Sequence, residues 1–282
     1  AGGTKLFGQS GRPIVIESFN VARSATISGV TTSFVGGPMF SQAKTDLLTP
    51  ANFGATGTVS RPVTFRTGLQ TLTAAALTGV DIFVLNQPAT ILSASEVQAL
   101  EQFVAEGGAV LELSNLGATR PVLFGTFAGS NLVDPTADFT LAGLTSPLAT
   151  GAFGTVTASL VTGPNSAYAV AGLATVIATN NSGPNVLLLA PDAGFSGLGR
   201  AVLIGDAEVF ATGHPNVNNY TVGSNKAVFL NTIAFLAQSP GFGIPAPAAG
   251  QTAAYRGPAN DFSTITKNAA GTYTRRLKDG TT

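Results

Sequence analysis

The 282-residue sequence contains no cysteine and only one histidine. The missing cysteine excludes disulfide bonds, thiolate metal sites and cysteine nucleophiles. A single imidazole is left for proton transfer or for metal ligation. The length is sufficient for one large α/β domain, or for a domain that carries an appendage.

Charged residues are also scarce. Asp, Glu, Lys and Arg make up 10% of the chain, against roughly 25% in an ordinary soluble domain. The 14 basic residues balance the 14 acidic ones, so the chain lacks the basic field that nucleic acid or anionic lipid requires. A surface of small and neutral polar side chains is commoner in extracellular bacterial proteins than in cytosolic enzymes. We therefore expect a bacterial protein that is secreted or held at the cell surface.

The apolar runs are short and β-branched, as in buried strands. Residues 12–19 form the first such run, and we expect a strand buried on both faces there. Val186–Ala190 is among the longest runs, yet a membrane-spanning helix needs about 20 apolar residues. The sequence therefore predicts no membrane span.

The clearest local pattern follows a predicted buried strand at residues 80–85. Ser93 and Glu96 have the spacing of a capping box, and apolar residues then recur at helical spacing on one face. Gly107–Gly108 ends the predicted helix, and Ala109–Leu113 is the next buried strand. Strand, capped helix and strand within about forty residues form a βαβ unit, which predicts a parallel sheet.

Four further elements are expected. They are a helix over 40–48, an outer strand over 59–65, a core strand over 199–206 and a helix over 224–238 with Ser224 as its N-cap. Between 115 and 199 the pattern breaks into short segments separated by Gly, Pro and Asn turns. This part is either an insertion or a set of antiparallel edge strands, with strands expected at 156–161, 174–178 and 186–190.

The composition changes near residue 240. We expect one α/β domain over 1–239, with its insertion at about 115–199, and a Pro/Gly linker over 240–250. The tail, 251–282, contains two charged, alternating segments that predict a β-hairpin. Alone, the tail is too small to bury a core.

The segment Leu72–Leu113 resembles the core of the class I glutamine amidotransferase-like superfamily. A second similar run covers residues 199–210, followed by Asn231 and Phe235–Leu236, and is typical of non-catalytic branches in secreted or membrane-attached bacterial proteins. The resemblance implies a flavodoxin-like α/β fold, a mostly parallel sheet flanked by helices with a β-rich insertion and a C-terminal hairpin tail. The residues that match in the first segment are Leu77, Gly79, Val80, Asp81, Leu85, Ser93, Glu96, Phe103, Val104, Gly107, Gly108, Val110 and Leu111.

The chain departs from the catalytic members of that superfamily. Those members carry a cysteine on a tight strand-to-helix elbow, with a histidine and a glutamate later in the chain. Here Ser114 follows the strand Ala109–Leu113, and nothing in the sequence marks a base for it. The resemblance therefore implies a domain of the non-catalytic type.

The tail has its own resemblance. Residues 261–281 are similar to the entry segment of RHS/YD-repeat proteins, which precedes the first β-hairpins of the repeats. This resemblance implies that the chain is one section of a much longer secreted protein.

Polar residues stand where the predicted parallel strands end. Ligands of open α/β sheets bind outside these carboxyl ends. If the carboxylates and the imidazole converge, they would hold a hard cation such as calcium, which prefers oxygen ligands. Alternatively, Glu112 and Asp206 cap loop amides, and His214 is a solvated loop residue. The candidate ligand-binding residues are Glu17, Asn86, Glu112, Asn115, Asp206, Glu208 and His214, with Ser18, Gln87 and Ser114 beside them.

Three functions are compatible with the sequence. The first is a non-catalytic structural or interaction module of a secreted bacterial surface protein, which contacts a protein or glycan at the cell surface and needs no cofactor. The second is a hydrolase that uses Asp206, Glu112 or Ser114 near His214. The third is a self-assembling filament or surface-layer subunit, because low charge offers little repulsion between copies.

Overall fold

The structure, a computed structural model, is built around a seven-stranded sheet with the order β11-β12-β13-β6-β5-β1-β4. The strands are β1 (Ile14–Ser18), β4 (Val63–Phe65), β5 (Ile82–Asn86), β6 (Ala109–Leu113), β11 (Thr175–Asn180), β12 (Gly183–Leu189) and β13 (Arg200–Ile204). The residues that the structure describes are 12–113, 131–134, 145–156, 165–168, 172–180, 183–191, 198–214, 218–239, 252–256, 262–267 and 273–276.

The sheet is mostly parallel. β4, β1, β5, β6 and β13 run in one direction, whereas β12 pairs antiparallel with β13, and β11 pairs antiparallel with β12. The predicted α/β class is confirmed, and the mixed sheet fits the flavodoxin-like type. β11 and β12 also confirm two of the edge strands expected between 115 and 199, while residues 157–161 of the third lie outside the described part of the chain.

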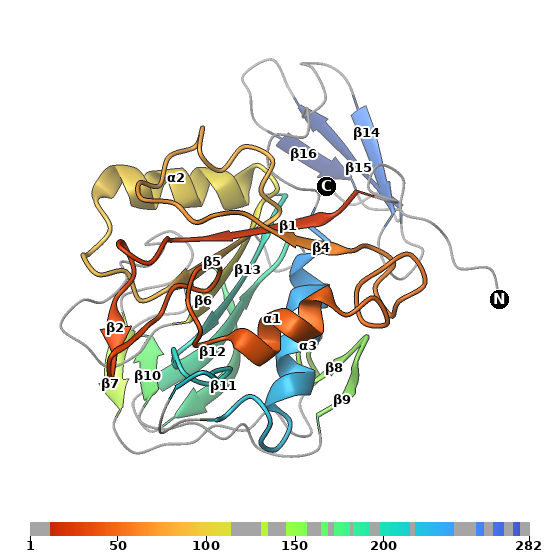
Figure 1. The fold of residues 1–282 in the computed structure, drawn as a ribbon. Coiled ribbons are helices and arrows are strands. Elements are labelled where there is room, and N and C mark those ends of the chain that lie inside the picture. The colour runs from red at the N-terminus through yellow and green to blue at the C-terminus, as the bar shows by residue number, and fades with distance from the viewer. Residues whose placement is uncertain are drawn as a thin grey trace.

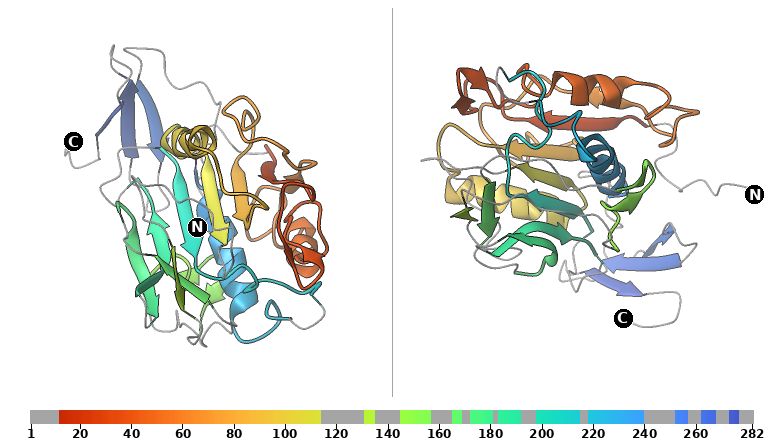
Figure 2. Two further views of the ribbon diagram at one scale, coloured as in Figure 1. Left: turned by 90° about the vertical axis from the view of Figure 1, so that its left-hand side faces the viewer. Right: turned by 90° about the horizontal axis from the view of Figure 1, so that it is seen from below.

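Helices cover both faces of this sheet (Figures 1 and 2). α2 (Ala94–Ala105) lies on one face, and α1 (Ser41–Leu48) and α3 (Asn225–Leu236) lie on the other. Each face has its own core of buried apolar side chains. Phe103 and Val110 belong to the core under α2, whereas Leu47 and Phe229 belong to the core under α1 and α3.

The predicted capping box starts α2. The Ser93 hydroxyl accepts from the backbone N–H of Glu96, and the Glu96 carboxylate accepts from the backbone N–H of Ser93. At the other end Gly107 has a φ of 112°, a conformation that favours glycine. Gly108 is required for a different reason, since a Cβ there would lie 2.3 Å from the Phe103 ring.

α3 is buried on nearly all sides, which its sequence did not predict. Its outer side is covered by the small hairpin of β8 (Thr150–Gly151) and β9 (Gly154–Thr155). Asn231 fixes this hairpin, because its Nδ2 donates to the carbonyls of Leu148 and Gly154, both at 3.1 Å. Ser224 occupies the predicted N-cap position, but its side chain makes no capping hydrogen bond.

Asp81 joins the starts of β1 and β5. Its carboxylate accepts from the backbone N–H of Val15 at 2.8 Å and pairs with the guanidinium groups of Arg12 and Arg61. The side chain is almost fully buried, so its charge requires these partners. Asp81 is one of the residues that carry the family resemblance. It stabilises the sheet, and it lies at the opposite end of the strands from the residues predicted to bind a ligand.

Three smaller antiparallel sheets complete the described elements. They pair β2 (Thr26–Ile27) with β3 (Val30–Thr31), β7 (Asn131–Asp134) with β10 (Asn165–Tyr168), and β15 (Phe262–Lys267) with β14 (Thr252–Arg256) and β16 (Tyr273–Arg276). The last sheet confirms the two strands predicted in the tail and adds β14. Among the described residues, no helix is both long and apolar enough to span a membrane.

Candidate functional site

Glu17 is one of the predicted edge residues, and it is buried beside the loop that follows β4. Its Oε1 accepts from the backbone N–H of Ser18 at 2.9 Å, and a second backbone bond comes from Gly68. Burial raises the pKa of Glu17, although these backbone bonds and the charge of Arg66 lower it in part. Glu17 therefore binds backbone amides, the role that the capping alternative gives to Glu112 and Asp206.

Glu112 is fully buried in the middle of the sheet. It pairs in register with Leu85 on one side and Leu203 on the other, and it points to the α2 face, as does Val110 two residues earlier. Neither carboxyl oxygen has a hydrogen-bond partner in the described part of the chain. Burial raises the pKa of Glu112 well above its usual value and so favours the neutral carboxyl group.

Asp206, Glu208 and His214 lie close to one another after β13. Asp206 Oδ1 accepts from the backbone N–H of Glu208 at 2.6 Å, and His214 Nε2 lies 3.6 Å from Glu208 Oε1. Asn86 joins this group through an Nδ2 bond to the carbonyl of Ala207 at 3.5 Å. The structure therefore brings together four of the seven predicted ligand-binding residues.

Glu112 does not join them. Residues 209–211, which precede His214, pack into the core under α1 and α3, on the opposite face of the sheet from Glu112. Within the described residues, no group of three or more His, Asp or Glu side chains is placed to hold a metal ion. Asn115 and Ser114 lie outside those residues, and the calcium site stays a prediction.

A pocket of about 850 Å³ opens elsewhere along the same edge of the sheet. From β1 the chain moves outward to β4 and then returns across β1 to β5, so the loops after β1 and β5 diverge. Such a reversal of strand order is where open α/β sheets bind ligands. The loops after β1, β4 and β5 line the pocket together with the first turns of α2. We call it the switch-point pocket.

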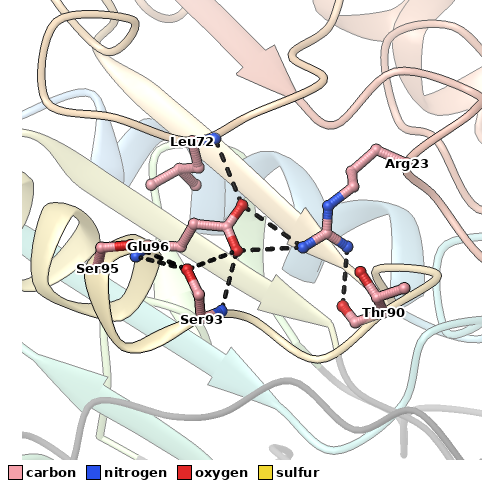
Figure 3. Close-up of polar contacts among 6 residues, drawn as sticks. All are labelled: Arg23, Leu72, Thr90, Ser93, Ser95 and Glu96. Carbon is pink, nitrogen blue, oxygen red and sulfur yellow. Dashed lines mark hydrogen bonds and ion pairs between the residues drawn. The ribbon is translucent and has the colours of Figure 1, made fainter.

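An ion pair between Arg23 and Glu96 lies in the switch-point pocket (Figure 3). Arg23 Nη2 is 3.2 Å from Glu96 Oε2, Nη1 donates to the carbonyl of Thr90 at 2.8 Å, and the guanidinium carbon stands 4.7 Å from the centre of the Phe19 ring. The guanidinium group therefore has its ion-pair, hydrogen-bond and ring partners inside the chain itself.

The Glu96 carboxylate is equally engaged. It accepts from the Ser93 backbone at 2.9 Å, from the Ser93 hydroxyl at 3.2 Å and from the Leu72 backbone at 3.5 Å (Figure 3). Burial raises the pKa of Glu96, but the Ser93 backbone bond and the charge of Arg23 outweigh it and bring the pKa below its usual value. The carboxylate is therefore ionised and has its partners inside the chain.

The rest of the polar lining is neutral. Three exposed glutamines and several hydroxyl groups surround the ion pair, together with the apolar side chains of Ala22, Ala74 and Ile91. Thr71, Thr90 and Gln98 make no side-chain hydrogen bond within the described residues. The principal neutral polar residues of the lining are Gln70, Thr71, Thr90, Ser95, Gln98 and Gln102.

The sequence does not predict this pocket. Its spacing marks Glu96 as a capping residue, and the partner Arg23 is 73 residues away in the chain. One signal was present, because Arg23 follows the first strand and Glu96 begins the helix after β5. In an open sheet these two places are neighbours if the strand order reverses between β1 and β5.

Comparisons with known proteins concern the fold. No family model matches the sequence, and no curated protein shows significant similarity to it. The structure is similar to the mmIFT52 N-terminal domain, with a TM-score of 0.52 and 13% identity over 79% of this chain and 96% of that one. This likeness supports the α/β architecture.

Two further solved structures have lower scores. Cytoplasmic protein STM3548 from Salmonella typhimurium has a TM-score of 0.48 and 12% identity, over 79% of this chain and 98% of that one. A protein described as ThuA-like from Bacteroides uniformis has a TM-score of 0.46 and 13% identity, over 83% of this chain and 94% of that one.

Proposed function

We propose that the α/β domain is a non-catalytic binding module that takes a neutral, hydroxyl-rich ligand, a glycan, in the switch-point pocket. The observation that carries this proposal is the state of the two charged residues in the lining. Arg23 and Glu96 neutralise each other, whereas the side chains free to bind are amides and hydroxyls. A charged ligand would meet no unpaired opposite charge there, but a neutral sugar exchanges hydrogen bonds readily with such groups.

The same contacts argue against acid–base catalysis in this pocket. A general acid or base has a pKa near the working pH and a proton to exchange with the substrate. The pKa of Glu96 is lowered instead, and its oxygens already accept from Ser93, Leu72 and Arg23. The hydrolase alternative therefore depends on Asp206, Glu112 or Ser114 near His214, and none of these residues belongs to this lining.

We further place this module in a secreted or surface-attached bacterial protein, of which this chain is one section. The low content of charged residues supports the location, and the likeness of residues 261–281 to an RHS/YD-repeat entry segment supports the larger protein. Immunoblotting of culture medium and cell fractions tests both points. A band found only in the cytosol would contradict the location, and a band near 28.3 kDa would contradict the longer polypeptide.

The binding proposal is tested on an array of neutral and charged oligosaccharides with the full 282-residue chain. We expect neutral glycans to be retained and Gln98→Ala to lower their retention several-fold, since one neutral hydrogen bond contributes about 1 kcal/mol. Gln42→Ala on α1 is the matched control, because Gln42 is also exposed but lies outside the pocket. Retention of charged glycans alone, or equal loss in both variants, would contradict the proposal.

A further inference from the structure

The orientation of the Gln70 amide is determined by a chain of hydrogen bonds. The backbone N–H of Arg23 donates to Asn20 Oδ1 at 3.0 Å, so the Nδ2 group of Asn20 points the other way. That group donates to Gln70 Oε1 at 3.1 Å. Because the oxygen of Gln70 is used, its NH₂ group is the part left to a ligand. Gln70 therefore presents hydrogen-bond donors in the pocket.

Gln102 has the opposite orientation. Its Nε2 donates to Glu106 Oε1 at 3.0 Å, and an ionised carboxylate only accepts. The contact therefore leaves Oε1 of Gln102 as an acceptor in the pocket. Gln70 comes from the loop after β4, and Gln102 comes from α2. The pocket thus has a donor on one wall and an acceptor on another.

A secondary amide in a ligand is complementary to the donor of Gln70 and the acceptor of Gln102. Its carbonyl oxygen accepts and its N–H donates, and in the trans form the two groups point in opposite directions. An acetamido group also carries a methyl group. The lining includes the small apolar side chains of Ala22, Ala74 and Ala99, and the Ile91 side chain, which is 55% exposed. Covering such apolar surface favours binding.

We propose, on the basis of the proposed glycan-binding function, that the switch-point pocket selects sugars that carry an N-acetyl group. Gln70 donates to the acetamido carbonyl, Gln102 accepts from the acetamido N–H, and the methyl group lies against the apolar side chains. The hydroxyl groups of Thr71 and Thr90 contact the hydroxyl groups of the sugar. These hydroxyls favour a sugar over a peptide, although a peptide also contains secondary amides.

The test compares two trisaccharides by isothermal titration of the full chain. The first is the fully N-acetylated trimer N,N′,N″-triacetylchitotriose, here called chitotriose. It has the same linkage as cellotriose, and the two differ in the acetamido or hydroxyl group at carbon 2. We expect chitotriose to bind about tenfold more tightly, since two neutral hydrogen bonds distinguish the sugars. Equal affinities would overturn the selectivity and leave the proposed function standing. A capped alanine tripeptide serves as a third probe. If neither sugar binds, or if only the tripeptide binds, both the selectivity and the proposed glycan-binding function are overturned.

Two variants assign the selectivity to the glutamines. Gln70→Met and Gln102→Met keep the length of the side chain but remove the amide. Each is expected to reduce the ratio of the two affinities several-fold, whereas Gln42→Met on α1 leaves the ratio unchanged. Thermal unfolding of every variant confirms that the fold is retained. A ratio that stays the same in both pocket variants would overturn the assignment.

Discussion

Arg23 Nη2 lies 3.2 Å from Glu96 Oε2, and the two side chains are each about 10% exposed. This pair joins the loop after β1 to the first turn of α2, two segments that are 73 residues apart. Among the described residues that line the switch-point pocket, Arg23 and Glu96 are the only two with a formal charge. The contact therefore fixes the shape of the pocket and makes its polar surface neutral.

Replacing Arg23 is expected to destabilise the domain. Arg23→Met removes the ion pair, the bond to the Thr90 carbonyl and the contact with the Phe19 ring, and it leaves Glu96 without its counter-charge. We expect a loss of about 2 kcal/mol in the free energy of unfolding, measured by urea denaturation. Glu96→Gln should cost less, because glutamine also forms a capping box. Equal stability of Arg23→Met and wild type would contradict this role.

The pH dependence of stability should show the contribution of Glu96. The pKa of Glu96 is lowered in the folded chain, so its contribution is present above the unfolded value of about 4.3 and is lost as the pH falls through the folded pKa. The difference in unfolding free energy between wild type and Glu96→Gln should therefore shrink from pH 7 to pH 3. A difference that is constant over this range would show that Glu96 does not titrate as described.

Glu112 should have the opposite pH dependence. Burial raises its pKa, so the folded state is favoured fully below the unfolded value of about 4.3, and this advantage is lost as the pH rises through the folded pKa. Glu112→Gln keeps the shape and cannot ionise, and its stability relative to wild type should increase as the pH rises above about 4.3. A parallel course of wild type and Glu112→Gln over this pH range would refute a raised pKa of Glu112.

Asp206→Ala distinguishes a structural residue from a catalytic one. Asp206 Oδ1 accepts from the backbone N–H of Glu208 at 2.6 Å. Losing this buried bond should cost about 1 kcal/mol of unfolding free energy and should leave glycan binding unchanged. The hydrolase alternative requires instead that turnover of a hydrolysable glycan disappears while the melting temperature stays the same. Thermal unfolding and a hydrolysis assay of the same preparation decide between these outcomes.

The sequence was most informative where the causes of structure are local. The spacing of Ser93 and Glu96 predicted the start of α2, and Gly107 predicted its end, because capping involves neighbouring residues. The short apolar runs predicted β5 and β6 for a similar reason, since strands buried on both faces show no alternation.

The rest depends on contacts between distant segments. α3 is covered by the hairpin of β8 and β9 as well as by the sheet, so it is buried on almost every side and not on one face alone. The convergence of the carboxylates depends on which face each strand presents, and Glu112 points away from the core that contains residues 209–211. The switch-point pocket depends on the strand order, which no single segment encodes.

The central claim is that a neutral glycan binds in the switch-point pocket. The most direct measurement is the NMR spectrum of the ¹⁵N-labelled full chain during titration with chitotriose. We expect the largest shift changes in the backbone amides of Arg23, residues 70–74, residues 89–91 and the first two turns of α2. Changes confined to residues 206–214, or no changes at millimolar sugar, would contradict the account.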